Sequence, residues 1–189
     1  MENFVTSTPH SDRPNATSFR KLAHLEVCLN ECVESSASTG LEDFHLVHRP
    51  LAAIDYREIV TSLSLWNKKL TLPLICAAMT GGHPDVRDVN ETIAKAAEKM
   101  GFAMGLGSQR AALEKDVPYI TESFGVVREL APNALLIGNL GAAQFSDHAG
   151  FGENELQKAI QMVKADAMAI HVNPAQELVQ IEEIGRAHV

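Results

Sequence analysis

Short apolar runs alternate with amphipathic stretches along the chain from residue 73 onward. Four runs have the length of buried parallel strands: Leu74–Ala78, Phe102–Leu106, Ala134–Ile137 and Ala167–Ile170. Apolar residues at helical spacing lie between them, over Asp85–Met100, Val117–Leu130 and Glu153–Lys164. Because the strands recur at the spacing of a βα repeat, about thirty residues, the pattern predicts four consecutive βα units.

The amino-terminal third has a different pattern. Residues 1–18 are rich in Ser, Thr, Pro and Asn, which predicts a flexible arm. Residues 19–33 place apolar side chains at helical spacing and predict a short amphipathic helix. The stretch 35–72 has no sustained periodicity, and it predicts loops with short extended segments.

Polar side chains follow every one of the four apolar runs. The clusters are Met79–Gly82, Gly107–Arg110, Gly138–Gly141 and His171–Glu177. Four βα units fit either a doubly wound sheet, which concentrates its site at one switch point, or half of a barrel, which collects residues from successive strands at one face. The clusters therefore favour an α/β fold of the (β/α)8 TIM-barrel type, with residues 19–182 forming about the first four units.

Composition narrows the class of function. The 189 residues include 16 basic and 24 acidic side chains, a net charge of −8. Without a basic cluster we expect no nucleic-acid partner, since phosphate backbones bind to positive patches, whereas a small anion needs only a few placed cations. No apolar run has the length of a signal-peptide core or a membrane span, so we expect a cytoplasmic protein with no membrane partner. The three cysteines have no disulfide or metal-binding spacing, and we expect inert thiols.

Three clusters offer groups for a flat or anionic ligand, and each has a structural alternative. Thr80 and the glycines after it allow backbone N–H groups to approach a ligand closely, or they form a tight turn. Arg110 can bind a phosphate through two parallel hydrogen bonds, or it lies in a solvated turn. Asn139 can pair with the edge of a heterocycle, or it occupies a left-handed turn position.

The fourth cluster carries the most reactive set of side chains. His171 supplies an imidazole that can act as a base, Asn173 and Gln176 supply amides, and Glu177 supplies a carboxylate. A carboxylate beside phosphate groups is a natural Mg²⁺ ligand. The alternative is that this segment only begins the following helix.

Five segments in this order resemble the type 2 isopentenyl-diphosphate isomerases, an FMN-dependent family. They are Arg20-Lys21 with His24, AAMTGG at 77–82, GLGSQRAAL at 105–113, GNLGAAQ at 138–144 and HVNPAQE at 171–177. The resemblance covers most of residues 20–180. It implies an enzyme of isoprenoid biosynthesis that interconverts isopentenyl and dimethylallyl diphosphate by a flavin-mediated shift of an allylic proton, with NADPH as the reductant of FMN.

The resemblance also implies a role for each matched residue. The residues at the flavin would be Ala78, Met79, Thr80, Gly81, Ser108 and Asn139. The residues that bind the diphosphate substrate would be Arg20, Lys21, Arg110, His171, Asn173 and Gln176. Gln176, beside the reacting carbons, and His171 would be catalytic, and Glu177 would bind Mg²⁺. The family further implies a homo-oligomer, a tetramer or larger.

Complete members of this family have eight βα units, twice the number that the pattern predicts here. We therefore expect an amino-terminal fragment that is inactive alone and leaves two strand edges uncovered. The last residues, 183–189, are interpreted as a non-native tail, because Ile184–Val189 can be encoded by the constant start of a common sequencing adapter.

Two other functions remain open at this point. An FMN-dependent 2-hydroxy acid oxidase-like barrel would carry out hydride transfer, but it needs a base and an arginine for a carboxylate and has no use for a Mg²⁺ ligand. A non-catalytic half-barrel fragment would fold by pairing with another half. The Arg20-Lys21 segment, which a scaffold does not need, argues against that second alternative.

Overall fold

A computed structural model describes residues 23, 25–51, 53–114, 118–146 and 150–173. The arm expected at residues 1–18 and the tail expected at 183–189 lie outside these residues. So do four of the predicted site residues: Arg20, Lys21, Gln176 and Glu177.

The centre of the fold is a parallel sheet of four strands in chain order, β3-β4-β5-β6. The strands are β3 (Ile75–Cys76), β4 (Ala103–Gly105), β5 (Leu136–Gly141) and β6 (Ala167–His171). Each lies in or overlaps one of the predicted apolar runs, so the prediction of four strands in an α/β fold is confirmed. Since the strands are parallel and adjacent in sequence order, their carboxyl ends all meet at one edge.

Strand β5 extends further than the sequence pattern indicated. It includes residues 138–141, which we expected to form a loop, and all four pair with β6. Gly138 allows close packing here, because a Cβ at that position would lie 2.3 Å from the Met168 sulfur and 2.7 Å from Gln109 Oε1. Asn139 is therefore a strand residue without a positive φ, and the left-handed turn alternative is wrong.

The three predicted helices are confirmed to within a few residues. They are α2 (Arg87–Met100), α4 (Pro118–Leu130) and α5 (Glu153–Val163), and a 3-10 turn, η3 (Pro84–Val86), leads into α2. Helix α2 ends at Gly101, whose φ of 70° is left-handed and whose N–H donates to the Ala97 carbonyl at 2.8 Å. This is the glycine cap that the sequence predicted.

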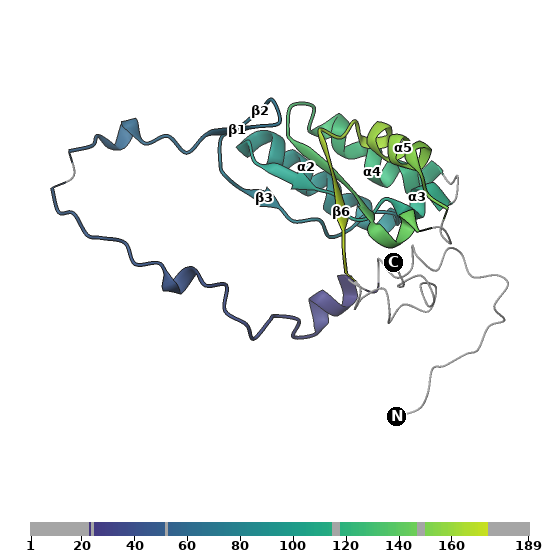
Figure 1. Ribbon diagram of the computed structural model, residues 1–189, viewed down its shortest axis with the longest axis horizontal. Coiled ribbons are helices and arrows are strands. Elements are labelled where there is room, and N and C mark those ends of the chain that lie inside the picture. The colour runs from purple at the N-terminus through teal and green to yellow at the C-terminus, as the bar shows by residue number, and fades with distance from the viewer. Residues whose placement is uncertain (1–22, 24, 52, 115–117, 147–149, 174–189) are drawn as a thin grey trace.

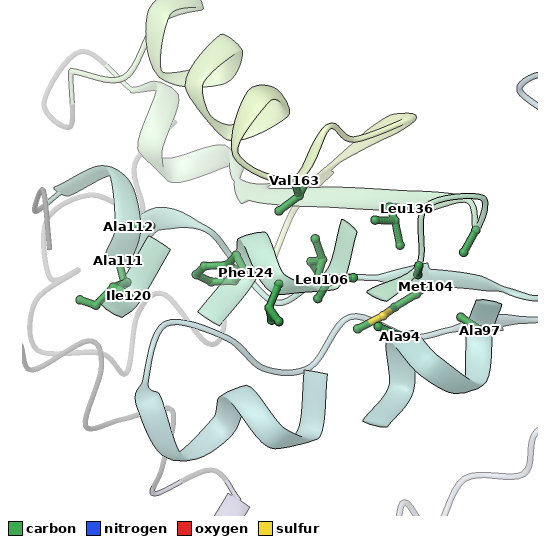
Figure 2. Packing of buried hydrophobic residues seen from close by; sticks show 14 residues of the cluster. Ala94, Ala97, Met104, Leu106, Ala111, Ala112, Ile120, Phe124, Leu136 and Val163 are labelled. Atoms are coloured by element: carbon green, nitrogen blue, oxygen red, sulfur yellow. The ribbon is translucent and has the colours of Figure 1, made fainter. Parts of the chain in front are cut away.

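The helices cover one face of the sheet (Figure 1). Met104 of β4 and Leu136 of β5 are register partners on that face, and both are buried. Figure 2 shows Phe124 of α4 and Val163 of α5 packed against the same cluster. Burial of this apolar surface is the main favourable contribution to folding.

A β-hairpin covers the amino end of the other face. Strands β1 (Leu63–Leu65) and β2 (Lys68–Leu70) are joined by Trp66 and Asn67, whose φ angles of 44° and 61° define the two-residue turn. Leu70 packs against Ala103 and Leu135 of the sheet. The sequence pattern predicts short extended segments here but not their pairing.

The segment before the hairpin includes a wide loop outside the α/β part of the molecule (Figure 1). Residues 25–30 are helical, which confirms part of the helix predicted over 19–33. Two 3-10 turns follow, η1 (Leu41–Asp43) and η2 (Tyr56–Glu58), and every described residue from 31 to 61 except Gly40 is exposed. Among the described residues, no helix has the length and apolar character needed to cross a membrane.

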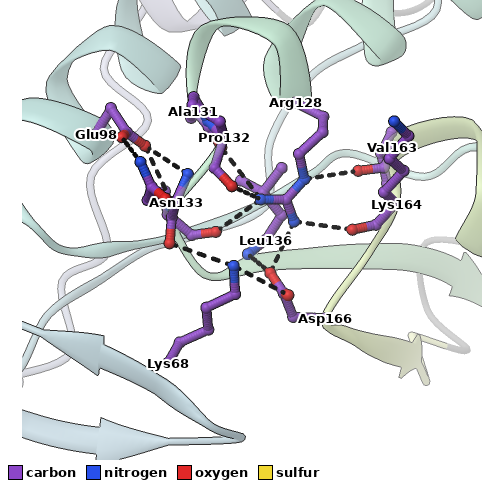
Figure 3. Close-up of polar contacts among 11 residues, drawn as sticks. Lys68, Glu98, Arg128, Ala131, Pro132, Asn133, Leu136, Val163, Lys164 and Asp166 are labelled. Atoms are coloured by element: carbon purple, nitrogen blue, oxygen red, sulfur yellow. Dashed lines mark hydrogen bonds and ion pairs between the residues drawn. The ribbon is translucent and has the colours of Figure 1, made fainter.

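Arg128 organises the polar contacts at the amino ends of the strands (Figure 3). Its guanidinium donates to five backbone carbonyl oxygens and to the Asp166 carboxylate, Nη2 to Oδ2 at 2.7 Å. The carbonyls belong to Ala131, Pro132, Ala134, Val163 and Lys164. Arg128 thereby joins the ends of α4 and α5 to the start of β5.

Asp166 completes this network. Its Oδ2 accepts a hydrogen bond from the Leu136 N–H at 2.9 Å, and its Oδ1 lies 3.5 Å from Lys68 Nζ of the hairpin. Burial alone would raise the pKa of Asp166, but the Leu136 amide and the Arg128 guanidinium outweigh it and hold that pKa below its usual value. Asp166 is therefore a stabilising carboxylate in its charged form.

Candidate functional site at the carboxyl edge of the sheet

The loops after β3 and β4 approach each other at backbone distance. Gly107 N donates to the Thr80 carbonyl oxygen at 3.1 Å, and a Cβ at Gly107 would lie 2.5 Å from that oxygen. Thr80 is buried, and among the described residues its Oγ1 is the buried side-chain polar atom that has no hydrogen-bond partner. A buried hydroxyl in this state carries a desolvation cost that a bound ligand can remove.

The two glycines after Thr80 pack against helix α4. Gly81 has a φ of 145°, and a Cβ there would lie 2.1 Å from the Phe124 ring. Gly82 N donates to Ser123 Oγ at 2.9 Å, and that hydroxyl donates to the Ile120 carbonyl at 2.6 Å. Close contact with α4 is thus one physical reason for glycine at position 81, and a left-handed φ of 87° is the reason at position 82.

The next cluster is partly helical. Arg110 begins a short helix, α3 (Arg110–Glu114), where the sequence analysis expected a loop. Its guanidinium is nearly buried, with Nε 3.5 Å from Glu114 Oε1, so the solvated-turn alternative is wrong. Ser108, just before it, is half-buried.

Gln109 is a structural residue in this cluster. It is fully buried, its Nε2 donates to the Ala159 carbonyl at 2.8 Å, and its Oε1 accepts from Asn139 N at 3.1 Å. Its own N–H donates to the Asn139 carbonyl at 2.9 Å. Gln109 therefore joins the segment after β4 to β5 and to the middle of α5.

Strands β5 and β6 bring two predicted site residues into direct contact. His171 Nδ1 lies 2.8 Å from Asn139 Oδ1, and His171 is the register partner of Gly141. Asn139 and Gly141 are two residues apart, so they share a face of the sheet. That face is the one opposite the helices, because Ile137, two residues earlier, packs in the hairpin cluster.

Gln144 also contributes to this arrangement, although the sequence pattern did not predict its role. It lies in a 3-10 turn, η4 (Ala142–Phe145), directly after β5, and its Oε1 accepts from Gly141 N at 2.7 Å. The signal was present, since Gln144 closes the GNLGAAQ segment. A polar side chain three residues after a strand end can turn back to that end.

The other described site residues lie around these contacts. Ala78, Met79 and Asn173 are exposed. A Cβ at Gly105 would lie 3.1 Å from Ala78 N, so the chain after β3 lies directly against β4. Within the described ranges, no three His, Cys, Asp or Glu side chains form a group that could hold a metal ion.

Comparison with known proteins gives the family. Proteins from Archaeoglobus fulgidus, Metallosphaera sedula and Methanosarcina barkeri, all named isopentenyl-diphosphate delta-isomerase, are each 46% identical to the chain. The alignments cover 88%, 86% and 89% of this chain. The chain belongs to the isopentenyl-diphosphate delta-isomerase family. No family model matches the chain.

The resemblance found in the sequence is thus confirmed at the level of the isomerase family. The chain spans about half the length of the curated relatives it matches, since the three alignments cover 47%, 43% and 45% of those proteins. The site described above therefore corresponds to about half of the length of these relatives.

Proposed function

We propose that the complete protein interconverts isopentenyl diphosphate and dimethylallyl diphosphate with the help of reduced FMN. The observation that carries this proposal is the 46% identity, over 88% of the chain, to a protein named isopentenyl-diphosphate delta-isomerase. The polar residues gathered at the carboxyl edge of a parallel sheet support it, because that edge is where such α/β folds place their chemistry. No observation favours an oxidase or a scaffold.

The residues around Thr80 fit a flavin. The buried Thr80 hydroxyl lacks a partner, and the contact between Gly107 and Thr80 leaves no room for a side chain between their loops. We propose that Met79, Thr80, Ser108 and Asn139 hold FMN, with Ala78 and Gly81 beside its ring. When bound and reduced, FMN would supply the group that takes and returns the allylic proton. NADPH is the proposed reductant.

The proposed diphosphate site uses local cations in a chain whose net charge is negative. Arg110, whose guanidinium is nearly buried beside Glu114, would donate to the diphosphate, and burial strengthens the attraction between opposite charges. His171 would add a ring N–H, and Asn173 would add a side-chain amide. By the resemblance, Arg20 and Lys21 complete the anion site, Gln176 lies beside the reacting carbons, and Glu177 holds Mg²⁺.

We further propose that the four strands form half of a (β/α)8 barrel. In the described part of the chain, β3 and β6 are the edge strands, and both carry exposed apolar side chains, Ile75 on β3 and Ile170 on β6. A second set of βα units would pair with both edges and cover this surface. A homo-oligomer in the cytoplasm remains our proposal for the complete protein.

The test joins residues 1–182 to the carboxyl-terminal half of the Archaeoglobus fulgidus protein. With FMN, Mg²⁺ and NADPH under anaerobic conditions, we expect the joined protein to retain flavin and to convert isopentenyl diphosphate. The 189-residue chain alone and the carboxyl-terminal half alone are the controls, and both should fail. A soluble, flavin-bound joined protein that converts no diphosphate but reduces its flavin with a 2-hydroxy acid would overturn the proposal in favour of the oxidase.

A further inference from the structure

We propose that Asn139 and Gly141 form a slot that positions the His171 ring and fixes its tautomer, with the proton on Nδ1. Asn139 Oδ1 lies 2.8 Å from His171 Nδ1. A Cβ at Gly141, two residues further along the same strand, would lie 2.9 Å from Nε2 and 3.0 Å from Cε1. Asn139 would thus act as a positioning residue in addition to any contact it makes with a ligand.

The Asn139 side of the slot is rigid. The Asn139 N–H and carbonyl are both bonded to Gln109, at 3.1 Å and 2.9 Å, and both residues are buried. The β5–β6 pairing places His171 opposite Gly141 on the same face. The backbone that carries the Asn139 side chain is therefore held by strand pairing and by a buried side chain from the segment after β4.

This contact has a chemical consequence for the imidazole. A side-chain carbonyl oxygen can only accept a hydrogen bond, so Nδ1 must carry the proton in both the neutral and the cationic ring. Nε2 is then the nitrogen that changes from acceptor to donor when the ring is protonated. Fixing the tautomer of a functional histidine through its other nitrogen is a general device of protein sites.

Position 141 has space only for a residue without a side chain. Gln144 Oε1 accepts from Gly141 N at 2.7 Å and would lie 2.4 Å from a Cβ at Gly141. An alanine there would meet Gln144 and the Nε2 edge of His171 at once. The glycine therefore determines how near the ring lies to β5.

The inference rests on the proposed function only for the ligand at Nε2, a diphosphate oxygen that accepts a hydrogen bond from the Nε2–H of the protonated ring. The slot itself is a property of the described residues. Its test therefore separates ring position, which needs no substrate, from anion binding, which does.

The experiment measures the tautomer of His171 by long-range ¹H–¹⁵N NMR on ¹⁵N-histidine-labelled protein. It uses the 189-residue chain and the joined protein described above, with His171→Gln to assign the signal. We expect the Nδ1–H form in both. Asn139→Asp, which keeps an acceptor oxygen, should retain that form, and Asn139→Leu should give a mixture of both forms.

Two further variants make the test specific. Ile137→Val, on the same strand and face, removes a methyl group away from the ring and should leave the His171 signal unchanged. Gly141→Ala should keep the Nδ1–H form but displace the ring, so the shift of His171 on adding inorganic pyrophosphate should need about tenfold more ligand. The same weakening is expected for Asn139→Leu.

The proposal is overturned if His171 of the original sequence shows the Nε2–H form. This measurement does not depend on the folding of any variant. It is also overturned if Asn139→Leu leaves the tautomer unchanged. Failure of the proposed function gives a different result. In that case the joined protein converts no diphosphate while His171 still shows the Nδ1–H form.

Discussion

The two ends of the same parallel sheet have opposite polar chemistry. At the amino end, Arg128 is bonded to five carbonyl oxygens and to a carboxylate, which in turn is bonded to a backbone amide. At the carboxyl end, the buried Thr80 hydroxyl has no partner, and the His171 ring meets Asn139 Oδ1 and lies against the backbone of Gly141. The amino end has the character of a stabilising network and the carboxyl end that of a binding site, which is the division expected in βα folds.

Buried polar groups therefore have two different uses within one domain. A buried group whose hydrogen bonds are all made within the chain holds elements together. A buried group left unpaired costs free energy and is tolerated where a ligand completes it. Removing the buried polar group should therefore lower the free energy of unfolding at the amino end, and leave it unchanged or raise it at the carboxyl end.

The largest expected effect is at the amino end. Arg128→Met removes all the contacts of the guanidinium, takes its donors from five carbonyls that are partly buried or exposed, and leaves Asp166 with Lys68 as its charge partner. We expect the free energy of unfolding to fall by about 3–5 kcal/mol, measured by urea denaturation. Arg87→Met is the matched control, since Arg87 forms an ion pair with Glu91 within one helix at the surface. A loss below about 1 kcal/mol for Arg128→Met would contradict the role we assign to the network.

A second test concerns the packing that supports the carboxyl end. Gly81→Ala places a methyl group into the Phe124 ring in a backbone conformation that L-residues avoid. We expect a loss of about 1–3 kcal/mol in the free energy of unfolding from strain and overpacking together. Gly150→Ala, with a φ of 74° and no atom within 4 Å, isolates the backbone part. Equal losses for the two variants would show that contact with Phe124 is unimportant.

The Asp166 carboxylate predicts how stability depends on pH. Its folded-state pKa lies below the ordinary value because the Leu136 amide and Arg128 outweigh burial. A depressed carboxyl pKa stabilises the fold above the unfolded-state pKa of about 3.9, and this contribution is lost as the pH falls through the folded-state pKa. The urea midpoint should therefore hold above about pH 5 and fall below about pH 4.

Asp166→Asn tests the origin of that slope. It should have a lower midpoint at pH 7 and a shallower decline in acid than the original sequence. Glu98 accounts for part of the loss of stability in acid that remains in Asp166→Asn. Burial raises the pKa of Glu98, but three hydrogen bonds from Asn133 and Ala134 outweigh burial and lower that pKa. Identical pH profiles for the two proteins would mean that Asp166 makes no contribution.

The smallest expected change in stability is at the unpaired hydroxyl. Thr80→Val replaces the partnerless Oγ1 by a methyl group of similar size, so the free energy of unfolding should stay the same or rise by up to about 1 kcal/mol. The joined protein should bind FMN about tenfold more weakly, a difference of about 1.4 kcal/mol, measured by flavin fluorescence. Thr80→Ser, which keeps the hydroxyl, should bind FMN normally. Loss of stability in Thr80→Val without loss of flavin affinity would assign Thr80 to the scaffold.

Much of the architecture was predictable because its causes are local. The strand and helix positions follow from apolar periodicity, and the end of α2 follows from Gly101. The hairpin was not predictable in detail, because its turn uses Trp66 and Asn67 instead of the usual glycine signal. The end of β5 was placed too early because Gly138 was interpreted as a loop residue, whereas it allows the Met168 side chain to approach.

The candidate site, like the fold, was predictable from the sequence only in part. The sequence by itself determined which residue types stand at the carboxyl ends of the strands and, through its motifs, the family to which they belong. Only the tertiary structure decided that Gln109 is a structural bridge, that Arg110 is nearly buried beside Glu114, and that His171 meets Asn139. The physical reason is that hydropathy and turn signals act within a few residues, whereas hydrogen-bond partners and burial depend on strands and helices about thirty residues apart in the chain.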